Sequence, residues 1–572
     1  MSSPQSPSLG IPPALLFPPP KSDPSSLMQR RTAKTILSSA EKQPSRLNQR
    51  TLGLPNRIWL ILTLFLSILL FTRLIFPWHH SDATDYHRHR TPSYAAALHP
   101  INYLNLSDAD NEAAQNPFPF CPTFGKGDAL AEKYGPLAIS KSWLHLGSGA
   151  RVHQVIHKAL LGQPVTISII GGSISSCHGS GDDPIAQDCY PSIFFDWWNT
   201  LFPHPASELT NGAIRKTNSE YFAFCSAHHL PDFTDLVIIE LDSDDKPHVL
   251  VRSILLRPDS PAIIVLGHFS PQVHEQNGFA GPDHWHSVVS QFYDVPHISS
   301  KAALYPSYIT SPPSILRYYT DPVLANPAGH GVLADMLIAY IQSQVCVAWN
   351  SARGTGASLH SYFTHGAQVG NSPKDATGLF GGRGLAQRMP RHRSSSGHPP
   401  SVQVPVARIG SRPSDLTTSD YEEIAPMCVS ANDLVNPLPP SLFHGSGWLA
   451  HHPPPTGVPV TDSTSHYWYS RLPTSRLRIP LIVGAGDVGI YYVLEPRAVL
   501  GSEGSSAIEC WVDDNYDGRV IIDNEGDSDS EEAALRMIDR SVAKGSHYIE
   551  CVLLGAEGVS VPPFKLIGIF AT

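Results

Sequence analysis

Three short runs of apolar and β-branched residues constrain the fold of this chain more than any other feature. They lie at residues 164–170, 235–241 and 262–266. A strand that is apolar on both sides is typical of a parallel sheet covered by helices on both faces. Helical patterns flank these runs, at residues 151–162, 192–201 and 330–345. Strands that alternate with helices predict an α/β domain built on a parallel sheet.

A longer apolar segment near the N-terminus predicts a membrane span. Residues 57–78 are almost wholly apolar, and 58–72 carry no charge. We expect one transmembrane helix over 57–78. A cleaved signal peptide is disfavoured, because the apolar run starts far from Met1 and lacks a small-residue cleavage site. A buried core helix is the third interpretation, but the segment shows no amphipathic period.

Charge is divided unevenly on the two sides of that segment. Residues 1–57 hold eight basic and two acidic residues, which predicts a cytoplasmic N-terminus and a lumenal remainder. The whole chain carries a formal charge of −10, and setting aside the tail and Arg73 leaves −17 for the lumenal part. Proteins that bind nucleic acid carry a basic excess, so we expect no nucleic-acid partner. The oligomeric state is left open.

All eight cysteines follow the predicted span. An even number of cysteines on the oxidising side of a membrane predicts disulfides, and with the span it indicates a type II protein of the Golgi or secretory pathway. We expect a local bridge between Cys177 and Cys189, and a second bridge between Cys510 and Cys551. No CxxC spacing indicates a zinc site.

Composition divides the chain into six parts. They are a Pro/Ser-rich basic tail (1–56), the span (57–78), a lumenal stem (79–140), the α/β domain (141–350), a Gly/Ser/Pro/Arg-rich linker or insert (351–426) and a C-terminal domain (427–572). The tail and the linker have the composition of disordered segments. Short strand-like runs separated by Gly, Asp and Pro turns predict that the last part is an all-β sandwich or jelly roll.

A serine follows the first apolar run at the point where an α/β sheet binds its ligands. The sequence there is Gly171-Gly-Ser-Ile-Ser175. Ligands of open α/β sheets bind at the carboxyl ends of the strands, and the glycines allow a tight turn that exposes Ser173. The alternative is a glycine turn with a serine that caps a helix. A phosphate-binding loop is disfavoured, since no lysine follows.

Further blocks follow in a fixed order, at 211–214, 219–225, 235–245 and 321–330. Their order and spacing resemble the SGNH (GDSL-like) hydrolase superfamily and, within it, the fungal capsule-associated protein family. The resemblance covers about 140–346 and extends more loosely to the C-terminal part. It implies a flavodoxin-like three-layer domain. It also implies a lumenal esterase or acyltransferase that acts on acyl groups, mainly O-acetyl groups, of glycans or of cell-wall or capsular polysaccharide, without a cofactor or a metal.

The resemblance also assigns roles to single residues. Ser173 matches the nucleophile, the backbone N–H groups of Ser173 and Gly212 match oxyanion donors, and Asp321 matches the acid that orients the catalytic histidine. Two positions depart from the pattern. Asp244 stands where the family has an asparagine donor, and an ionised carboxylate cannot donate a hydrogen bond. Leu324 stands in the position of the histidine base.

Other histidines are candidates for the missing base. His330 is close in sequence to Asp321 and is our first candidate, with a capping or packing role at the start of its helix as the alternative. His284 and His286 form an HxH pair that would bind a metal or reach the site, or would lie on the surface. His178 follows Ser173 by five residues.

Two other functions remain open. Leu324 and Asp244 favour a catalytically degenerate protein that binds a glycan or a partner. A glycosyltransferase is the third class, because Asp242-Ser-Asp244 resembles an element that holds a metal–nucleotide complex.

Overall fold

The computed structural model describes two compact units, residues 1–90 and residues 91–572. The described ranges are 99–105, 116–241, 248–353, 403–405, 426–432, 444–452, 466–500, 504–527 and 531–572, with scattered residues from 50 to 67. In the first unit, β1 (Arg50–Thr51) pairs with β2 (Leu54–Pro55), and a few residues from Ile58 onward are helical. Most of the predicted span at 57–78 lies outside the described residues, so the span stays a prediction.

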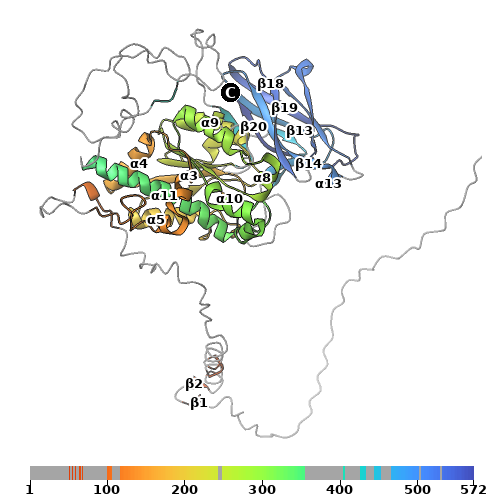
Figure 1. The fold of residues 1–572 in the computed structure, drawn as a ribbon. Helices are drawn as coiled ribbons and strands as arrows, with labels where there is room; N and C mark the ends of the chain where they lie inside the picture. Colours follow the sequence, from red (N-terminus) through yellow and green to blue (C-terminus); the bar gives the residue numbers. More distant parts are fainter. Residues whose placement is uncertain are drawn as a thin grey trace, which may run out of the picture. The chain divides into compact units, whose positions relative to one another are not determined.

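The centre of the second unit is a six-stranded, mostly parallel sheet (Figure 1). Its strands, in spatial order, are β3 (Trp143–His145), β8 (His297–Ser299), β7 (Ala262–Gly267), β6 (Leu236–Glu240), β4 (Thr166–Gly171) and β5 (Glu208–Asn211). Only β3 is antiparallel to its neighbour. The three apolar runs became β4, β6 and β7, so the predicted α/β sheet is confirmed.

The strand order fixes where a ligand would bind. Counted along the chain, the five parallel strands lie in the order 2-1-3-4-5, a doubly wound arrangement whose order reverses between β4 and β6. A crevice forms outside the carboxyl ends of the strands at such a reversal. Ser173 directly follows β4 and therefore lies at this point.

Helices cover both faces of the sheet. One core cluster joins the sheet to α4 (Ala150–Leu160), α5 (Tyr190–Leu201) and α11 (Pro327–Ala352), and another joins it to α6 (Ser219–Cys225), α7 (His248–Leu255) and α9 (Asp283–Tyr293). Shorter helices complete the domain: α2 (Ala129–Tyr134), α3 (Pro136–Ser142), α8 (Pro271–Asn277) and α10 (Lys301–Thr310). Among the described residues, α11 is long and apolar enough to cross a membrane, but it is mostly buried and forms part of the core.

The C-terminal region is an all-β domain of two sheets around its own apolar core. One sheet contains β10 (His444–Ser446), β13 (Arg476–Val483), β19 (Gly545–Leu553), β15 (Ala507–Val512) and β16 (Val520–Asp523). The other contains β11 (Leu449–His451), β12 (Tyr467–Ser470), β20 (Phe564–Ala571), β14 (Val488–Pro496) and β17 (Glu525–Gly526), with β18 (Glu532–Asp539) and β9 (Met427–Ser430) at its side. The predicted all-β domain is therefore confirmed.

The all-β domain packs on α6 of the α/β domain. Tyr491, on β14, belongs to the same apolar cluster as Tyr221, and the rings of Phe224 and Phe570 stack 4.1 Å apart. A disulfide joins Cys225, on α6, to Cys428, on β9. The other disulfides are Cys121–Cys346, Cys177–Cys189 and Cys510–Cys551, and no cysteine is free. The two predicted bridges are confirmed.

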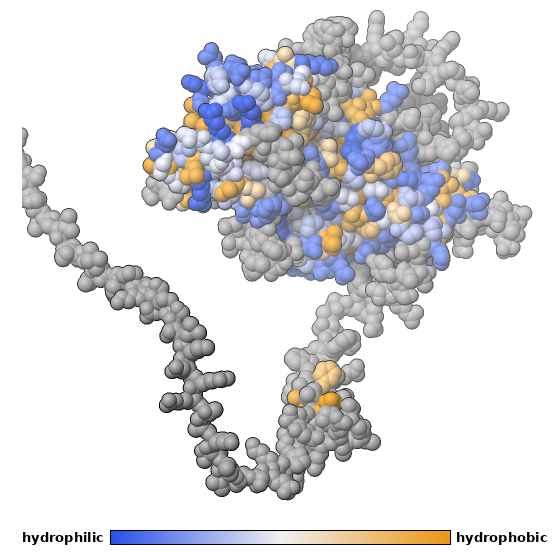
Figure 2. All heavy atoms as spheres, turned by 180° about the vertical axis from the view of Figure 1, so that it is seen from behind, coloured by the Kyte–Doolittle hydropathy of each residue, from blue (hydrophilic) through white to orange (hydrophobic). Residues whose placement is uncertain are grey.

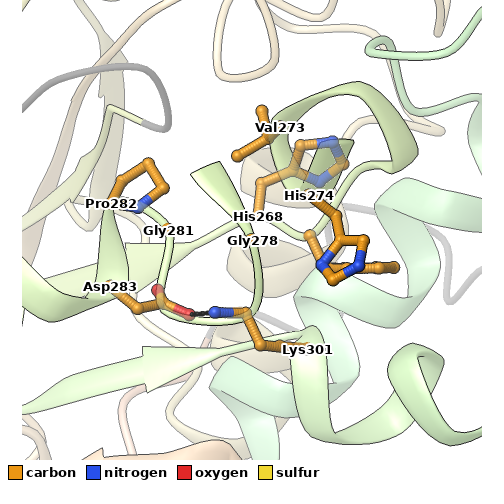
Figure 3. A pocket seen from close by; sticks show the side chains of 9 residues that line it. His268, Val273, His274, Gly278, Gly281, Pro282, Asp283 and Lys301 are labelled. Atoms are coloured by element: carbon orange, nitrogen blue, oxygen red, sulfur yellow. Dashed lines mark ion pairs between the residues drawn. The ribbon is translucent and has the colours of Figure 1, made fainter. Parts of the chain in front are cut away.

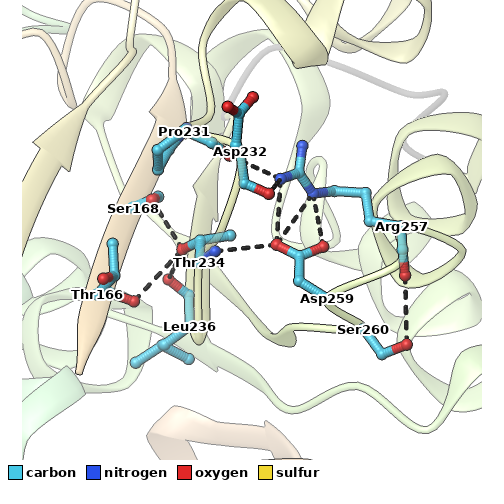
Figure 4. A network of polar contacts seen from close by, with 9 residues as sticks. All are labelled: Thr166, Ser168, Pro231, Asp232, Thr234, Leu236, Arg257, Asp259 and Ser260. Atoms are coloured by element: carbon cyan, nitrogen blue, oxygen red, sulfur yellow. Dashed lines mark hydrogen bonds and ion pairs between the residues drawn. The ribbon is translucent and has the colours of Figure 1, made fainter. Parts of the chain in front are cut away.

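Polar contacts fix the amino-terminal edge of the sheet, opposite the edge that carries Ser173. Arg257 binds Asp259, and the Asp259 carboxylate accepts a hydrogen bond from the backbone N–H of Thr234 at 2.9 Å (Figure 4). The Thr234 hydroxyl lies 2.8 Å from that of Ser168, on β4. On the face in Figure 2, hydrophobic residues lie scattered among hydrophilic ones, as is usual for a surface in contact with water.

Candidate functional site

Ser173 lies in a tight turn directly after β4 and is half-buried. Its hydroxyl oxygen accepts a hydrogen bond from the backbone N–H of Lys216 at 3.2 Å. Its carbonyl accepts one from the N–H of His178 at 3.0 Å. Ser173 is therefore fixed at the carboxyl end of a central strand, with a backbone donor directed at its hydroxyl.

A buried carboxylate anchors this turn. Glu240, at the end of β6, accepts hydrogen bonds from the N–H of Ser175 at 3.0 Å and from its hydroxyl at 2.7 Å. Because the Ser175 hydroxyl donates to Glu240, the Tyr190 hydroxyl, 2.7 Å away, donates to Ser175. A side chain at Gly171 would place its Cβ 2.3 Å from the Ser175 hydroxyl, so this close approach requires glycine.

The backbone N–H of Gly212 does not face the Ser173 hydroxyl, and the N–H of Lys216 donates to that hydroxyl. The N–H of Gly212 donates to the carbonyl of Ile169 at 3.0 Å and continues the pairing of β4 with β5, so it cannot also serve an oxyanion. A Cβ at Gly212 would lie 2.1 Å from the carbonyl oxygen of His229, which explains the glycine by packing. Lys216 adopts a left-handed conformation with φ of 54°. No residue type in the sequence indicated this donor.

A histidine–carboxylate pair lies next to the Ser173 turn. His178 Nδ1 lies 2.7 Å from Asp182 Oδ1, and a carboxylate can only accept, so Nδ1 carries the hydrogen. Arg215 donates to the same oxygen at 2.8 Å. Partial burial opposes ionisation of Asp182, but the hydrogen bond from His178 and the charge of Arg215 together lower its pKa. With Nδ1 occupied, the other nitrogen of His178 is the basic one.

Asp321 and Leu324 do not form an acid–base pair. The Asp321 carboxylate accepts hydrogen bonds from the backbone N–H groups of Val323 at 2.8 Å and Leu324 at 2.7 Å, and so it stabilises its own turn. Leu324 packs on the apolar core, and its Cβ lies 3.4 Å from the position that a Cβ at Gly179 would take. An apolar side chain therefore lines this side of the Ser173 loop.

His330, which was predicted to be the catalytic base, has a structural role as the cap of a helix. It is fully buried in α11, and its Nδ1 accepts a hydrogen bond from the N–H of Tyr190 at 3.3 Å. Tyr190 is the first residue of α5, whose N-cap, Cys189, makes no side-chain cap, so His330 caps this helix. Burial, with a smaller effect from His268, lowers the pKa of His330 to about 3. The ring is neutral at physiological pH.

The remaining predicted positions fall elsewhere. Asp244, and with it Asp242-Ser-Asp244, lies outside the described residues. His284 is exposed at the start of α9, with its ring edge-on to that of Trp285, whereas His286 is buried beside His297. The HxH pair therefore does not act as a unit, because neighbours two apart on a helix point in different directions.

A pocket lies at the same edge of the sheet, outside β7 and β8. It is small and partly open to solvent, and it is lined by His268, Phe269, Val273, His274, Gly278, Gly281, Pro282, Asp283 and Lys301 (Figure 3). Lys301 Nζ lies 2.6 Å from an Asp283 oxygen. His268 Nε2 donates to the carbonyl of Val323 at 2.9 Å and connects the pocket to the Asp321 turn. Burial lowers the pKa of His268 to about 4.

No known protein-family model matches the chain, and no curated protein matches it. Among solved structures, it is similar to a two-domain esterase active on acetylated mannans, with 19% identity, a TM-score of 0.48, and coverage of 76% of this chain and 98% of that chain. The same esterase co-crystallized with mannopentaose gives 19% identity, a TM-score of 0.48, and coverage of 76% and 97%. A family two carbohydrate esterase from Cellvibrio japonicus gives 11% identity, a TM-score of 0.16, and coverage of 26% and 33%. At these identities and TM-scores, the likenesses do not fix the family or the chemistry of this chain.

Proposed function

We propose that the protein is an esterase or acyltransferase with Ser173 as its nucleophile, acting on O-acetyl groups of a glycan. The observation that carries this proposal is the hydrogen bond from the Lys216 N–H to the Ser173 hydroxyl, 3.2 Å long, at the carboxyl end of β4. This bond fixes the nucleophilic oxygen at the ligand-binding edge of the sheet. The oxyanion would form on the carbonyl oxygen of the substrate, and a donor directed at that atom contributes about 2.7–4 kcal/mol to transition-state stabilisation.

His178 supplies the base in this proposal. Asp182 accepts the Nδ1 hydrogen at 2.7 Å, so Nε2 is the nitrogen that would take the Ser173 proton and return it to the leaving hydroxyl. In the described part of the chain, the Ser173 hydroxyl bonds to the Lys216 N–H and not to this ring. The Ser173 oxygen bonds to the acyl carbon, the carbon–oxygen bond of the ester breaks, and the sugar hydroxyl leaves with the proton. Water then releases acetate, or a second hydroxyl accepts the acyl group.

The substrate class and the location rest on the sequence. The glycan ester follows from the resemblance to the SGNH hydrolases and the capsule-associated proteins. The predicted span at 57–78 and the basic tail make the protein a single-pass type II protein of the Golgi or secretory pathway. Four disulfides that pair all eight cysteines support an oxidising compartment.

A second function, glycan binding without catalysis, is favoured by a different observation. Leu324 occupies the usual base position, and Asp321 is engaged with its own turn. In this case the α/β domain keeps the shape of a hydrolase, and it binds the glycan without cleaving the ester.

Turnover of p-nitrophenyl acetate and of an acetylated mannan by the full chain separates the two functions. Under the proposal, Ser173→Ala lowers kcat/KM by about 10³-fold or more, and His178→Gln lowers it by about 10²-fold or more. His284→Gln, a change at an exposed histidine, is the matched control and retains activity. Ester turnover that is unchanged in Ser173→Ala rules out the esterase. If the wild type shows no turnover, and both the wild type and Ser173→Ala bind the mannan equally, the binding function is supported.

A further inference from the structure

Three buried side chains converge beside the pocket at the ends of β7 and β8. Asp283 and His286 lie in the first turn of α9, and His297 begins β8. One nitrogen or oxygen atom from each lies within 4.8 Å of the other two. The sequence pattern pointed to His284 and His286. On a helix, however, residues three apart share a face, so Asp283 is the neighbour of His286.

The contacts around these side chains orient them toward one another. Ser287 Oγ lies 3.1 Å from His297 Nδ1, and His297 Nε2 faces Asp283 Oδ1 at 3.4 Å. The other Asp283 oxygen accepts hydrogen bonds from Ser299 at 3.0 Å and from Lys301 at 2.6 Å. Carboxylate ligands of metals commonly use one oxygen for the metal and the other for hydrogen bonds of this kind, and ligating histidines are oriented through their second nitrogen.

The backbone leaves room for this arrangement. A Cβ at Gly267, the last residue of β7, would lie 2.4 Å from Asp283 Oδ1. The carboxylate therefore sits directly over the end of the strand, and glycine is required there. Asp283 also forms part of the pocket wall (Figure 3), whereas His286 and His297 are buried and do not line the pocket.

We infer that Asp283, His286 and His297 bind one divalent transition-metal ion, with Zn²⁺ as the best fit. Two imidazole nitrogens and one carboxylate oxygen suit Zn²⁺, which binds such ligands at about 2.0–2.2 Å. Ca²⁺ is a poor fit, because it prefers six to eight oxygen ligands. Three protein ligands leave a fourth position for water or another ligand.

Lys301 competes with a metal ion for the carboxylate of Asp283. Without a metal, its ammonium group and the His297 ring both face the Asp283 carboxylate. With Zn²⁺ on Oδ1, Lys301 remains on Oδ2, and the two cations share one carboxylate. This proximity lowers the affinity for the metal relative to a site without a lysine, because like charges repel. The site is independent of Ser173, so its test and the test of the esterase do not depend on each other.

Metal titration of the full chain, stripped with a chelator, tests the inference. We expect one equivalent of Zn²⁺ to bind and to raise the Tm, and Co²⁺ to give the visible absorption of a four-coordinate site. His286→Gln and His297→Gln should each weaken this equivalent at least 100-fold and abolish the Tm rise. His284→Gln is the matched control and should bind like the wild type.

Other histidines of the chain make the variants necessary. The stem sequence contains His79, His80, His87 and His89, which remain in every variant, so metal bound there persists in His286→Gln. The inference is overturned if the wild type and His286→Gln bind the same number of metal equivalents. It is also overturned if Co²⁺ gives only the weak spectrum of a hydrated ion. If His297→Gln does not fold, the comparison of the wild type with His286→Gln, together with the Co²⁺ spectrum, decides the question.

Discussion

Two groups of charged side chains at one edge of the sheet differ in their environment. At the end of β4, Asp182 is 59% exposed and is shared by His178 and Arg215. At the ends of β7 and β8, Asp283 is 13% exposed and lies between His297 and Lys301. The first group is next to a serine and faces solvent. The second is preorganised in the interior, as the binding of a small ion requires. The same edge therefore holds one exposed and one buried group of charged side chains.

The largest expected difference comes from one substitution made at both places. Asp283→Asn removes the counter-charge of a lysine whose side chain is only 15% exposed, and breaking such a pair costs about 3–5 kcal/mol of stability. Asp182→Asn removes a carboxylate that is 59% exposed, although its partner Arg215 is only 14% exposed. Because water already screens this carboxylate, we expect the smaller loss, of about 1 kcal/mol. Urea unfolding near pH 7 in the presence of a chelator measures both. Equal losses would show that the two environments do not differ as described.

The next effect is a loss of stability in acid. Burial lowers the pKa of His268 to about 4 and that of His330 to about 3, whereas an unfolded histidine titrates near 6.5. Between these values the unfolded chain binds more protons, so stability is complete above about pH 6.5 and falls as the pH drops. At pH 4 each histidine costs about 3 kcal/mol.

Urea midpoints measured from pH 7 to pH 4 test this loss. His268→Gln should flatten the decline by removing one titrating group, while His284→Gln, at an exposed position, should leave it as steep as in the wild type. A decline that is identical in all three proteins would contradict the assignment to buried histidines.

The smallest effect concerns the donor beside Ser173. Lys216 has φ of 54° and an ion pair with Glu531 at 3.5 Å. Lys216→Ala loses the ion pair and keeps the strained backbone. Lys216→Gly also loses the ion pair, but it relieves the left-handed conformation while keeping the N–H. We expect Lys216→Gly to be more stable than Lys216→Ala by about 1 kcal/mol, as measured by thermal unfolding. The opposite order would show that the backbone here is not strained.

Much of the fold was predictable because burial on both faces of a strand leaves a visible apolar run. The run at 164–170 became β4, and the short runs after 470 became strands of the all-β domain. β18 (Glu532–Asp539) was missed, because its acidic and small residues lack a strand pattern. The docking of β14 on α6 was also missed, since neither element alone indicates its partner.

A site residue was predictable only where its position in the order of strands and helices determined its location. Ser173 follows a buried strand and so had to lie at the ligand-binding edge. The donor at Lys216 depends on a backbone angle that its residue type does not indicate. His330 is close to Asp321 in sequence, but it lies on α11 and is buried in the core, where it caps α5. His286 lies beside Asp283 because residues three apart share a face of a helix. The HxH spacing of His284 and His286 did not predict this contact.

The disulfide between Cys225 and Cys428 has a consequence for biosynthesis. The two cysteines are 203 residues apart, and at about 5–20 residues per second Cys225 emerges roughly 10–40 s before its partner. The partner of Cys177 follows after only 12 residues. Throughout that interval, α6 lacks both its covalent tie and the aromatic surface that covers it. The nascent α/β domain therefore exposes a free thiol beside an apolar patch. The disulfide to Cys428, on β9, removes the thiol, and only the later strands β14 and β20 cover the patch.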